Sequence, residues 1–408
     1  MNDASAGTMV IDGGVTAPPG FRAAGVHCGL RRARKDLALL VSDVPAAVAG
    51  VFTMNKAQAA PILVDRVQLR TGAPCSAVVV NSGNANACTG ERGLNDAWTM
   101  VRTVASALGV PAEQVLVSST GVIGQYLPMD RVLEGIPAAV AALDRANARD
   151  AAEAIMTTDT CLKEYAVRVT IGGQQITIGA MAKGSGMIAP NMATMLAFIT
   201  TDLAIDQALL TPALKHVTER SFNRISVDGD MSTNDMAIVM ANGVAGNAPI
   251  VSAGDARYIE FRDALEHVMI VLAKMIARDG EGATKLIEVV VRGAASEEAA
   301  TAAARSVANS NLVKTAIHGC DANWGRVLAA LGYSGIEFNP DDVEIALNGV
   351  PVILRNYEIV LDEELAKEAL SRDEVVIDIS LGDGAHEVYF WTCDLTKEYI
   401  HINASYRS

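Results

Sequence analysis

Residues 183–202 read KGSGMIAPNMATMLAFITTD, and the patterns on either side of this stretch are arranged around it. Its first half is rich in Gly, Ser, Pro and Asn, the residues that build loops. Pro190 fixes its own φ and pushes the preceding Ala189 towards an extended backbone. From Met195 a short apolar run predicts a buried strand. Thr194 stands at the junction, where a threonine has an ordinary explanation, because β-branched residues favour strands.

Length and charge limit the class of protein. The chain has 408 residues, which is longer than a single hydrophobic core usually stabilises. We therefore expect two or more subdomains. The net charge of −14 argues against nucleic-acid binding, because phosphate contacts need clustered Lys and Arg. Residues 1–20 lack the layout of a signal peptide, and the longest apolar stretch, 267–277, is too short to span a bilayer. We therefore expect no nucleic-acid or membrane partners, and the scattered cysteines fit a reducing cytoplasm best.

Neither a metal nor a nucleotide site is expected. The six cysteines are scattered and form no C-x-x-C pair, which argues against structural zinc and against a disulfide framework. The Asp-rich loop 226–235 lacks the spacing of a calcium loop, so we assign it either a structural role or a role in supporting residues that contact the substrate. Residues 279–285, DGEGATK, lack the Gly-Lys-Ser/Thr order of a phosphate loop. His318, Cys320 and Asp321 are close enough to suggest a thiol nucleophile, a possibility that geometry must test, and we assign residues 318–326 to the lining of an active site.

Strands and helices alternate along the chain. Apolar runs predict strands at 37–41, 46–52, 77–80 and 115–117, and apolar spacing predicts helices at 62–69 and 94–108. Residues 165–170 and 175–181 have the pattern of a hairpin joined by Gly172 and Gly173. Further on, predicted helices at 256–278, 297–309 and 363–370 alternate with short strands at 286–292, 343–347, 375–379 and 387–391. The pattern indicates an α/β protein.

Two polar segments follow predicted strands. Residues 81–90, NSGNANACTG, are explained by a turn whose Asn side chains bond their own backbone, although polar loops after strands also line active sites. Residues 118–124, SSTGVIG, open from the strand at 115–117. Backbone N–H groups at such a strand end can stabilise an oxyanion, and an ordinary hydroxyl-rich turn is the alternative.

Seven strings occur in the order and spacing of one protein family. They occupy residues 81–90, 118–124, 156–159, 183–202, 279–285, 318–326 and 399–408, and the string at 183–202 is the most specific. Together they resemble the ornithine acetyltransferase (glutamate N-acetyltransferase) family of arginine biosynthesis. That family's precursor breaks between the Ala and Thr of this string, here Ala193 and Thr194, and the Thr becomes the N-terminal nucleophile.

The resemblance implies a fold and an assembly. The fold is a layered α/β sandwich with paired β-sheets between helices. Cleavage gives an alpha chain of residues 1–193 and a beta chain of residues 194–408, which associate as a heterotetramer of two alpha and two beta chains. No cofactor is implied, but acetyl-CoA is a possible co-substrate.

The resemblance also implies which residues act. Thr120 and Gly121 form the oxyanion hole, and Thr194 is the nucleophile. The substrate-binding positions fall on Thr157, Lys183, Thr194, Glu281, Asn403 and Ser408. Ser408 stands where the family more often has Thr, so it keeps the hydroxyl and loses a methyl group.

The implied reaction moves an acetyl group from N2-acetyl-L-ornithine to L-glutamate through acetyl-Thr194. A hydroxyl nucleophile needs a base, and no Ser-His-Asp pattern is readable. Cleavage would supply a base, because the new α-amino group of Thr194, with a pKa near ~8 in peptides, lies beside its own hydroxyl.

Lys183 could pair with the α-carboxylates of the substrates, and Glu281 could pair with the ornithine ammonium. Asn403 and Ser408 could serve the side-chain carboxylate of glutamate. The reverse order of the substrate ends stays open.

Two other functions stay open. A self-processing amidase or aminopeptidase would use the same Thr194 with water as acceptor and would release free acetate. A non-enzymatic binding protein on this fold would tolerate Thr194→Ala and would remain one chain. The sequence does not decide whether acetyl-CoA also donates the acetyl group, which would make the enzyme bifunctional.

Overall fold

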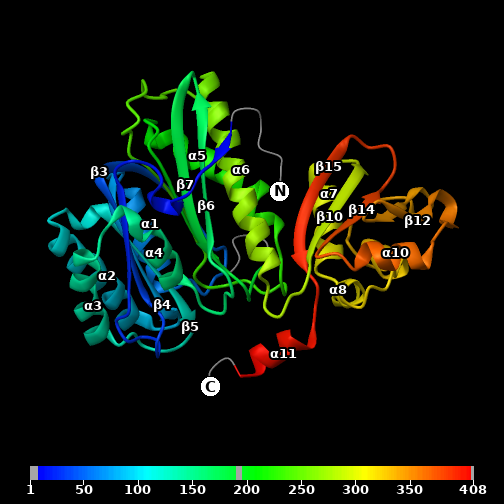
Figure 1. The fold of residues 1–408 in the computed structure, drawn as a ribbon, viewed down its shortest axis with the longest axis horizontal. Helices are drawn as coiled ribbons and strands as arrows, with labels where there is room; N and C mark the ends of the chain where they lie inside the picture. Colours follow the sequence, from blue (N-terminus) through cyan, green and yellow to red (C-terminus); the bar gives the residue numbers. More distant parts are fainter. Residues whose placement is uncertain (1–7, 190–194, 406–408) are drawn as a thin grey trace. The chain divides into compact units, whose positions relative to one another are not determined.

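The computed structural model describes residues 8–189 and 195–405, which form two compact units (Figure 1). The first unit comprises Met1–Gly184, Asn191–Asn223 and Met231–Leu272, and the second comprises Ser185–Pro190, Arg224–Asp230 and Ala273–Ser408. The expectation of more than one subdomain is confirmed. These units differ from the segments 1–193 and 194–408, which are defined by a predicted cleavage and not by compactness.

The first unit is built on a nine-stranded sheet in the order β1-β6-β7-β8-β9-β3-β4-β5, with β2 paired to β3. The strands are β1 (Met9–Val10), β2 (Phe21–Val26), β3 (Leu37–Phe52), β4 (Cys75–Asn84), β5 (Val115–Val122), β6 (Lys163–Ile171), β7 (Gln174–Lys183), β8 (Leu196–Thr201) and β9 (Met236–Ala241). The strands predicted at 37–41 and 46–52 are a single strand, β3. Its first half pairs with β2 and β4, its second half pairs with β9, and the register shifts between Val41 and Ala46.

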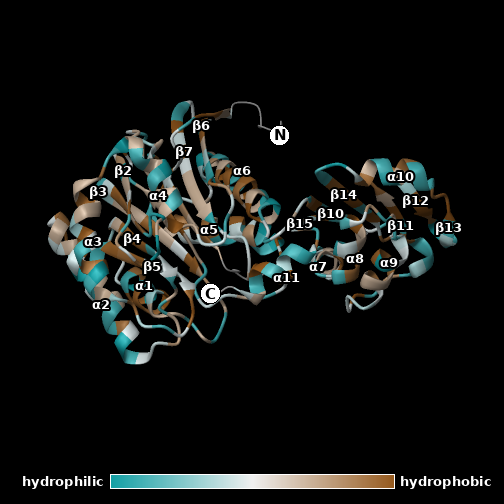
Figure 2. Ribbon diagram, turned by 60° about the horizontal axis from the view of Figure 1, so that its bottom comes forward, coloured by the Kyte–Doolittle hydropathy of each residue, from teal (hydrophilic) through white to brown (hydrophobic). Residues whose placement is uncertain are grey.

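Helices cover the sheet, and strand residues alternate between two cores, as a period of two requires. On one face Leu37 and Leu39 pack with α1 (Ala60–Arg70), α2 (Gly90–Leu108) and α3 (Met129–Ala141). On the other, Leu40 packs with α4 (Ala148–Ile155) and with apolar residues of β7, β8 and β9. The remaining helices are α5 (Gln207–Arg220) and α6 (Ala256–Arg278), and Figure 2 shows the apolar character of β3 and β4. The predicted α/β class, with sheet layers between helices, is confirmed.

The predicted hairpin and the apolar run of the central stretch are also confirmed. β6 and β7 pair antiparallel through Gly172 and Gly173, which both have a positive φ. β7 then pairs antiparallel with β8, so that Lys183 lies opposite Leu196. Every residue of β8 is buried. The central stretch therefore leaves one strand of the sheet at Lys183 and re-enters the neighbouring strand at Leu196.

The second unit has a six-stranded sheet in the order β13-β12-β11-β14-β10-β15. Its strands are β10 (Leu286–Ala294), β11 (Glu344–Leu347), β12 (Val350–Leu354), β13 (Glu358–Ile359), β14 (Glu374–Ser380) and β15 (His386–Cys393). Its helices are α7 (Glu297–Ala308), α8 (Asn311–His318), α9 (Trp324–Gly332), α10 (Glu363–Leu370) and α11 (Lys397–Ala404). Apolar residues of α7, α8 and α9 share one core with this sheet. Helix α11 has no buried residue and is mostly teal in Figure 2.

The two polar segments after strands are less loop-like than the sequence predicts. β4 extends to Asn84 and β5 to Val122, because the two strands continue their parallel pairing beyond their apolar parts. Residues 118–120 therefore lie buried in a strand and not in a turn. The Asn-rich segment does bond itself as predicted. Asn81 Nδ2 donates to the carbonyl of Asn84 at 2.9 Å, and the N–H of Asn86 donates to Asn84 Oδ1 at 2.8 Å.

A buried carboxyl group supports β5. Oδ1 of Asp65, in α1, accepts the N–H of Val117 at 2.9 Å, and Oδ2 has no partner among the described residues. Burial raises the pKa of Asp65 well above its ordinary value, and the hydrogen bond from Val117 opposes this only in part. The unfolded chain therefore loses this proton near pH 4, whereas the folded protein keeps it. Asp65 thus lowers the stability progressively as the pH rises above about 4.

We expect Asp65→Asn, which keeps the acceptor oxygen, to raise the melting temperature at pH 7. The gain should shrink as the pH falls. It should vanish below about pH 4, where Asp65 is protonated in both the folded and the unfolded protein. Thermal unfolding of both proteins across this pH range measures the effect. An equal gain at pH 3.5 and pH 7 would show that ionisation of Asp65 is not its cause.

Candidate active site

Strand β5 carries Thr120 and Gly121 at one edge of the nine-stranded sheet. Gly121 has a φ of +134°, a backbone conformation that residues other than glycine rarely adopt. A Cβ on Gly121 would lie 2.3 Å from the carbonyl carbon of Gly83, so glycine allows β4 and β5 to approach closely. Thr120 is buried. The predicted oxyanion pair therefore stands on a tightly packed strand end, where β4 lies against Gly121.

Thr157 and Lys183 are tied to one carboxylate, Asp159, to which the sequence pattern assigned no role. Its Oδ2 accepts the N–H of Thr157 at 2.9 Å, and its Oδ1 accepts the N–H of Gly184 at 2.6 Å. Lys163 Nζ lies 2.8 Å from Oδ1, and Lys183 Nζ lies 3.8 Å from Oδ2. All three charged side chains are buried. Asp159 therefore fixes the start of the central stretch and brings two predicted site residues together.

This cluster has a definite charge state. Burial alone would raise the pKa of Asp159, but the ammonium groups of Lys183 and Lys163 more than offset it and hold the pKa below its ordinary value. Asp159 is therefore ionised at neutral pH.

Asp235, immediately before β9, holds the chain just after Thr194. Asp235 Oδ1 accepts the N–H of Met195 at 3.0 Å, and the carbonyl of Met195 accepts the N–H of Met236 at 3.2 Å. Burial raises the pKa of Asp235 well above its ordinary value, although the Met195 hydrogen bond and the Lys183 charge act in the other direction. Met195 is therefore fixed at both of its backbone groups.

Three predicted residues, Ala193, Thr194 and Ser408, lie outside the described residues. Their predicted roles rest on the resemblance alone.

In the second unit Glu281 and Asn403 meet. Asn403 Nδ2 donates to Glu281 Oε2 at 2.7 Å and to the carbonyl of Tyr399 at 3.0 Å. The N–H of Glu281 donates to the carbonyl of Ser185 at 3.0 Å. A Cβ on Gly186 would lie 2.3 Å from the carboxyl carbon of Glu281, so glycine leaves room for this carboxylate. The two predicted substrate-binding residues thus form one group in which the amide orients the carboxylate.

Asp228 holds the arm of the central stretch that belongs to the second unit. Its Oδ2 accepts the N–H of Met187 at 2.6 Å, and its Oδ1 accepts the N–H of Ile188 at 2.9 Å. Tyr399 also donates its hydroxyl to Oδ2 at 3.2 Å. Burial and the neighbouring Asp228 raise the pKa of Tyr399 above its ordinary value. The structural role predicted for the loop 226–235 is confirmed for Asp228.

Geometry does not support a thiol nucleophile at Cys320. Its Sγ lies 3.0 Å from Lys285 Nζ, whereas His318 Nδ1 lies 2.8 Å from Asp394 Oδ2. His318 and Cys320 therefore have different partners, and no hydrogen bond joins them in the described part of the chain. His318 and Cys320 each belong to a polar cluster with a structural role in the second unit.

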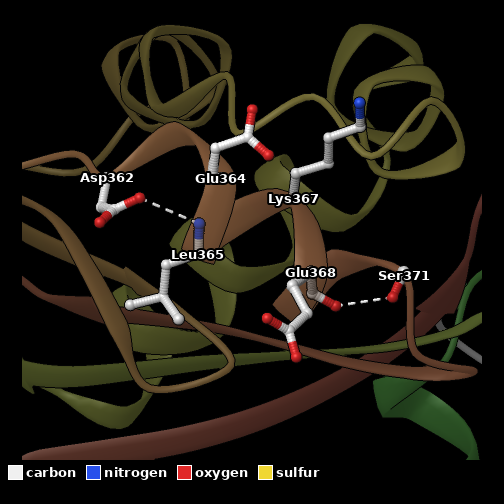
Figure 3. A pocket seen from close by; sticks show the side chains of 6 residues that line it. All are labelled: Asp362, Glu364, Leu365, Lys367, Glu368 and Ser371. Carbon is white, nitrogen blue, oxygen red and sulfur yellow. Dashed lines mark hydrogen bonds between the residues drawn. The ribbon is translucent and has the colours of Figure 1, made fainter.

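A surface pocket of about 560 Å³ lies on α10 (Figure 3). Its lining residues are Asp362, Glu364, Leu365, Lys367, Glu368 and Ser371. Asp362 Oδ1 accepts the N–H of Leu365 at 3.0 Å, and Ser371 Oγ donates to the carbonyl of Glu368 at 2.7 Å. These two polar groups serve the ends of the helix. None of the lining residues belongs to the predicted site.

Within residues 8–189 and 195–405, no group of three or more His, Cys, Asp and Glu side chains has the arrangement of a metal site. In the same ranges, no helix has both the length and the apolar character that crossing a membrane requires.

Comparison with known proteins decides the family. The chain matches the ArgJ family over residues 22–408. It is 57% identical over 399 residues to the arginine biosynthesis bifunctional protein ArgJ of Symbiobacterium thermophilum, which covers 97% of this chain and 99% of that protein. The chain belongs to the ArgJ family. The ArgJ protein of Caldanaerobacter subterraneus subsp. tengcongensis is 50% identical over 403 residues, covering 98% of this chain and 100% of the relative. The family identified from the sequence is thereby confirmed.

Two solved structures match parts of the chain in sequence. The ornithine acetyltransferase of Mycobacterium tuberculosis, solved in complex with ornithine, is 42% identical with a TM-score of 0.42, and covers 45% of this chain and 98% of its own. The ArgJ protein of Bacillus halodurans is 44% identical with a TM-score of 0.44, and covers 47% of this chain and 100% of its own.

Proposed function

We propose that this ArgJ-family chain is the glutamate N-acetyltransferase, or ornithine acetyltransferase, of arginine biosynthesis. It moves the acetyl group of N2-acetyl-L-ornithine to L-glutamate and yields L-ornithine and N-acetyl-L-glutamate. The observation that carries this proposal is the match to the ArgJ family over residues 22–408, together with relatives named as arginine biosynthesis bifunctional proteins.

Self-cleavage prepares the nucleophile. The hydroxyl of Thr194 attacks the carbonyl carbon of Ala193, the C–N bond breaks, and the nitrogen becomes the α-amino group of Thr194. Water then hydrolyses the ester and leaves an alpha chain of residues 1–193 and a beta chain of residues 194–408. Hydrogen bonds to the backbone near the scissile bond in sequence support this step. Asp228 accepts the N–H groups of Met187 and Ile188, and Asp235 accepts that of Met195.

In turnover, the same hydroxyl attacks the acetyl carbonyl carbon of N2-acetyl-L-ornithine. The α-amino group of Thr194 takes the hydroxyl proton and gives it to the departing amine of ornithine. Thr120 and Gly121 stabilise the negative oxygen of the tetrahedral intermediate. The amine of L-glutamate then attacks acetyl-Thr194 and restores the free hydroxyl.

The substrate contacts follow from charge. Lys183 pairs with the α-carboxylate that both substrates carry, and Thr157 is positioned beside it through Asp159. Glu281, oriented by Asn403, holds the side-chain ammonium of ornithine. Asn403 and Ser408 serve the side-chain carboxylate of glutamate.

Lys183→Met should raise the KM for both substrates by roughly 10- to 100-fold, as expected when a hydrogen bond to a charged group is lost. Lys163→Met is the matched control, because it removes the other buried ammonium group on Asp159. Steady-state kinetics of both variants separate substrate binding from the shared electrostatics. Unchanged KM values in Lys183→Met, or an equal rise in Lys163→Met, would contradict the assignment.

The second activity and the setting are further parts of the proposal. Acetyl-CoA acts as an additional acetyl donor to L-glutamate, which the word bifunctional in the names of the relatives supports. No resident cofactor takes part. The two cleaved chains assemble as a heterotetramer of two alpha and two beta chains, and the enzyme works in the cytoplasm without nucleic-acid or membrane partners.

Product analysis tests the proposed function. Purified protein with N2-acetyl-L-ornithine and L-glutamate should yield L-ornithine and N-acetyl-L-glutamate in equal amounts. Free acetate formed regardless of glutamate would instead support a self-processing amidase or aminopeptidase. Absence of any product from a folded protein would overturn the enzymatic assignment.

A further inference from the structure

Residues 232–235 have the sequence STND. This STND segment contacts two parts of the first unit that carry candidate catalytic groups. All four residues are buried. The segment is anchored by Thr53, which donates its hydroxyl to the carbonyl of Ser232 at 2.8 Å and its N–H to the carbonyl of Asp235 at 3.0 Å. The N–H of Asn234 donates to Ser232 Oγ at 3.0 Å. The segment cannot shift without breaking several buried hydrogen bonds.

Asn234 holds β5 just before Thr120. Its Nδ2 donates to the carbonyl of Ser119 at 2.8 Å and to that of Ala85 at 2.6 Å, and its Oδ1 accepts the Thr233 hydroxyl at 2.5 Å. The amide orientation follows from chemistry, since backbone carbonyls can only accept. The carbonyl of Ser119 belongs to the planar peptide group that leads into Thr120. Asn234 therefore sets the plane from which the predicted oxyanion hole begins.

Asp235, the next residue, holds the chain just after the predicted nucleophile. The Met195 nitrogen, which is bonded covalently to Thr194, donates its hydrogen to Asp235 Oδ1. Since one peptide bond joins Asn234 to Asp235, the two points that they hold cannot move independently. An error of about 1 Å in such an arrangement can cost about 100-fold in rate.

We propose that Asn234 and Asp235 are positioning residues that set the Thr194 nucleophile against the Thr120 and Gly121 oxyanion hole, in self-cleavage and in acetyl transfer. This inference rests on the proposed function. Asn234 acts as a donor and Asp235 as an acceptor. Burial favours the neutral carboxyl form of Asp235, and the role proposed for it needs only Oδ1 as an acceptor.

Two isosteric substitutions have opposite expected results. Asn234→Asp keeps the shape but turns an oxygen towards the carbonyls of Ser119 and Ala85, and cleavage should slow by at least about 100-fold. Asp235→Asn keeps the acceptor, and cleavage should stay within about threefold of the natural chain. Asp235→Ala removes the acceptor and should slow cleavage as Asn234→Asp does. Pulse-chase labelling of the full chain measures conversion of the precursor into two fragments.

Asp202→Ala is the matched control. Asp202 follows the far end of β8, is equally buried, and accepts the N–H of Thr177 at 2.8 Å. It should lower the melting temperature without slowing cleavage. Slow cleavage in Asp202→Ala would mean that stability of β8 is the cause and would overturn the inference.

The remaining outcomes separate the two proposals. After Asn234→Asp has been left to cleave, its kcat should fall while its KM values stay within about threefold, as a loss of alignment predicts. Asn234→Asp and Asp235→Ala that cleave at the natural rate, or an Asp235→Asn as slow as Asp235→Ala, would overturn the inference. If the natural chain itself forms no fragments, the proposed function fails instead.

Discussion

Thr194→Ala should leave the protein as a single chain of about 42.8 kDa and should abolish acetyl transfer. The substitution removes the oxygen that attacks the Ala193 carbonyl, so the chain stays uncut. An uncut chain has no α-amino group on residue 194 and therefore lacks the base as well as the nucleophile. Loss of a nucleophilic hydroxyl that acts together with its base costs about 10⁶-fold in kcat. We expect turnover below detection, measured by product analysis and a denaturing gel.

Thr194→Ser is the control for this substitution. It keeps a hydroxyl on the residue after Ala193, so it should cleave and turn over, although more slowly than the natural chain. The uncut forms of both variants should have a melting temperature close to that of the uncut natural chain. Two fragments from Thr194→Ala, or N-acetyl-L-glutamate formed by it, would contradict the mechanism.

Asp159→Ala is expected to have the largest effect on stability. The substitution leaves Lys163 and Lys183 buried without their shared carboxylate, and it removes the acceptor for the N–H groups of Thr157 and Gly184. Removal of one member of a buried ionic group costs about 3 to 5 kcal/mol. We expect a loss of this size in the free energy of unfolding measured in urea. Self-cleavage should also slow, because Gly184 begins the central stretch.

Two comparisons test the electrostatic origin of this loss. Adding Lys163→Met to Asp159→Ala should recover part of the stability, since one of the two ammonium groups that Asp159 neutralises is removed. The pH dependence has a definite sign. The folded-state pKa of Asp159 is lowered, so its contribution is complete above about pH 4 and is lost as the pH falls towards the folded value. A double variant no more stable than Asp159→Ala, or a loss that persists undiminished at pH 2.5, would contradict this explanation.

The sequence predicted elements where local pattern and pairing agree. The hairpin around Gly172 and Gly173 and the strand that begins at Leu196 follow from apolar runs bounded by turn residues. The lengths of β4 and β5 could not be read, because residues such as Asn81 and Ser119 have no strand preference. Pairing with a neighbouring strand, together with a hydrogen bond of 2.6 Å from Ser119 Oγ to Asn81 Oδ1, keeps them extended.

The role of Asp159 was within reach of the sequence. The hairpin places Lys163 opposite Ala182, so Lys163 and Lys183 lie at the same open end. Two buried ammonium groups this close need an anion, and Asp159 stands four residues before Lys163. For Asn234 and Asp235 the sequence predicted only that their loop is structural or supports the site, and nothing indicated which residues they contact. Their partners Ser119 and Met195 are 115 and 40 residues away along the chain, and only the folded sheet brings them together.

The candidate site was predicted from resemblance and not from pattern. The structure adds the direct hydrogen bond between Asn403 and Glu281, which were predicted separately. It also ties Thr157 to Lys183 through Asp159. A single sequence contains no periodicity that would connect such pairs, because each depends on where distant elements end.

An intact-mass measurement of the denatured protein, before and after addition of N2-acetyl-L-ornithine without L-glutamate, tests the mechanism most directly. We expect two fragments, of 193 residues and of 408 − 193 = 215 residues, with the longer one beginning at Thr194. After addition of the substrate, the longer fragment should be heavier by one acetyl group. A single 42.8 kDa chain, or acetylation of the 193-residue fragment instead, would contradict Thr194 as the nucleophile.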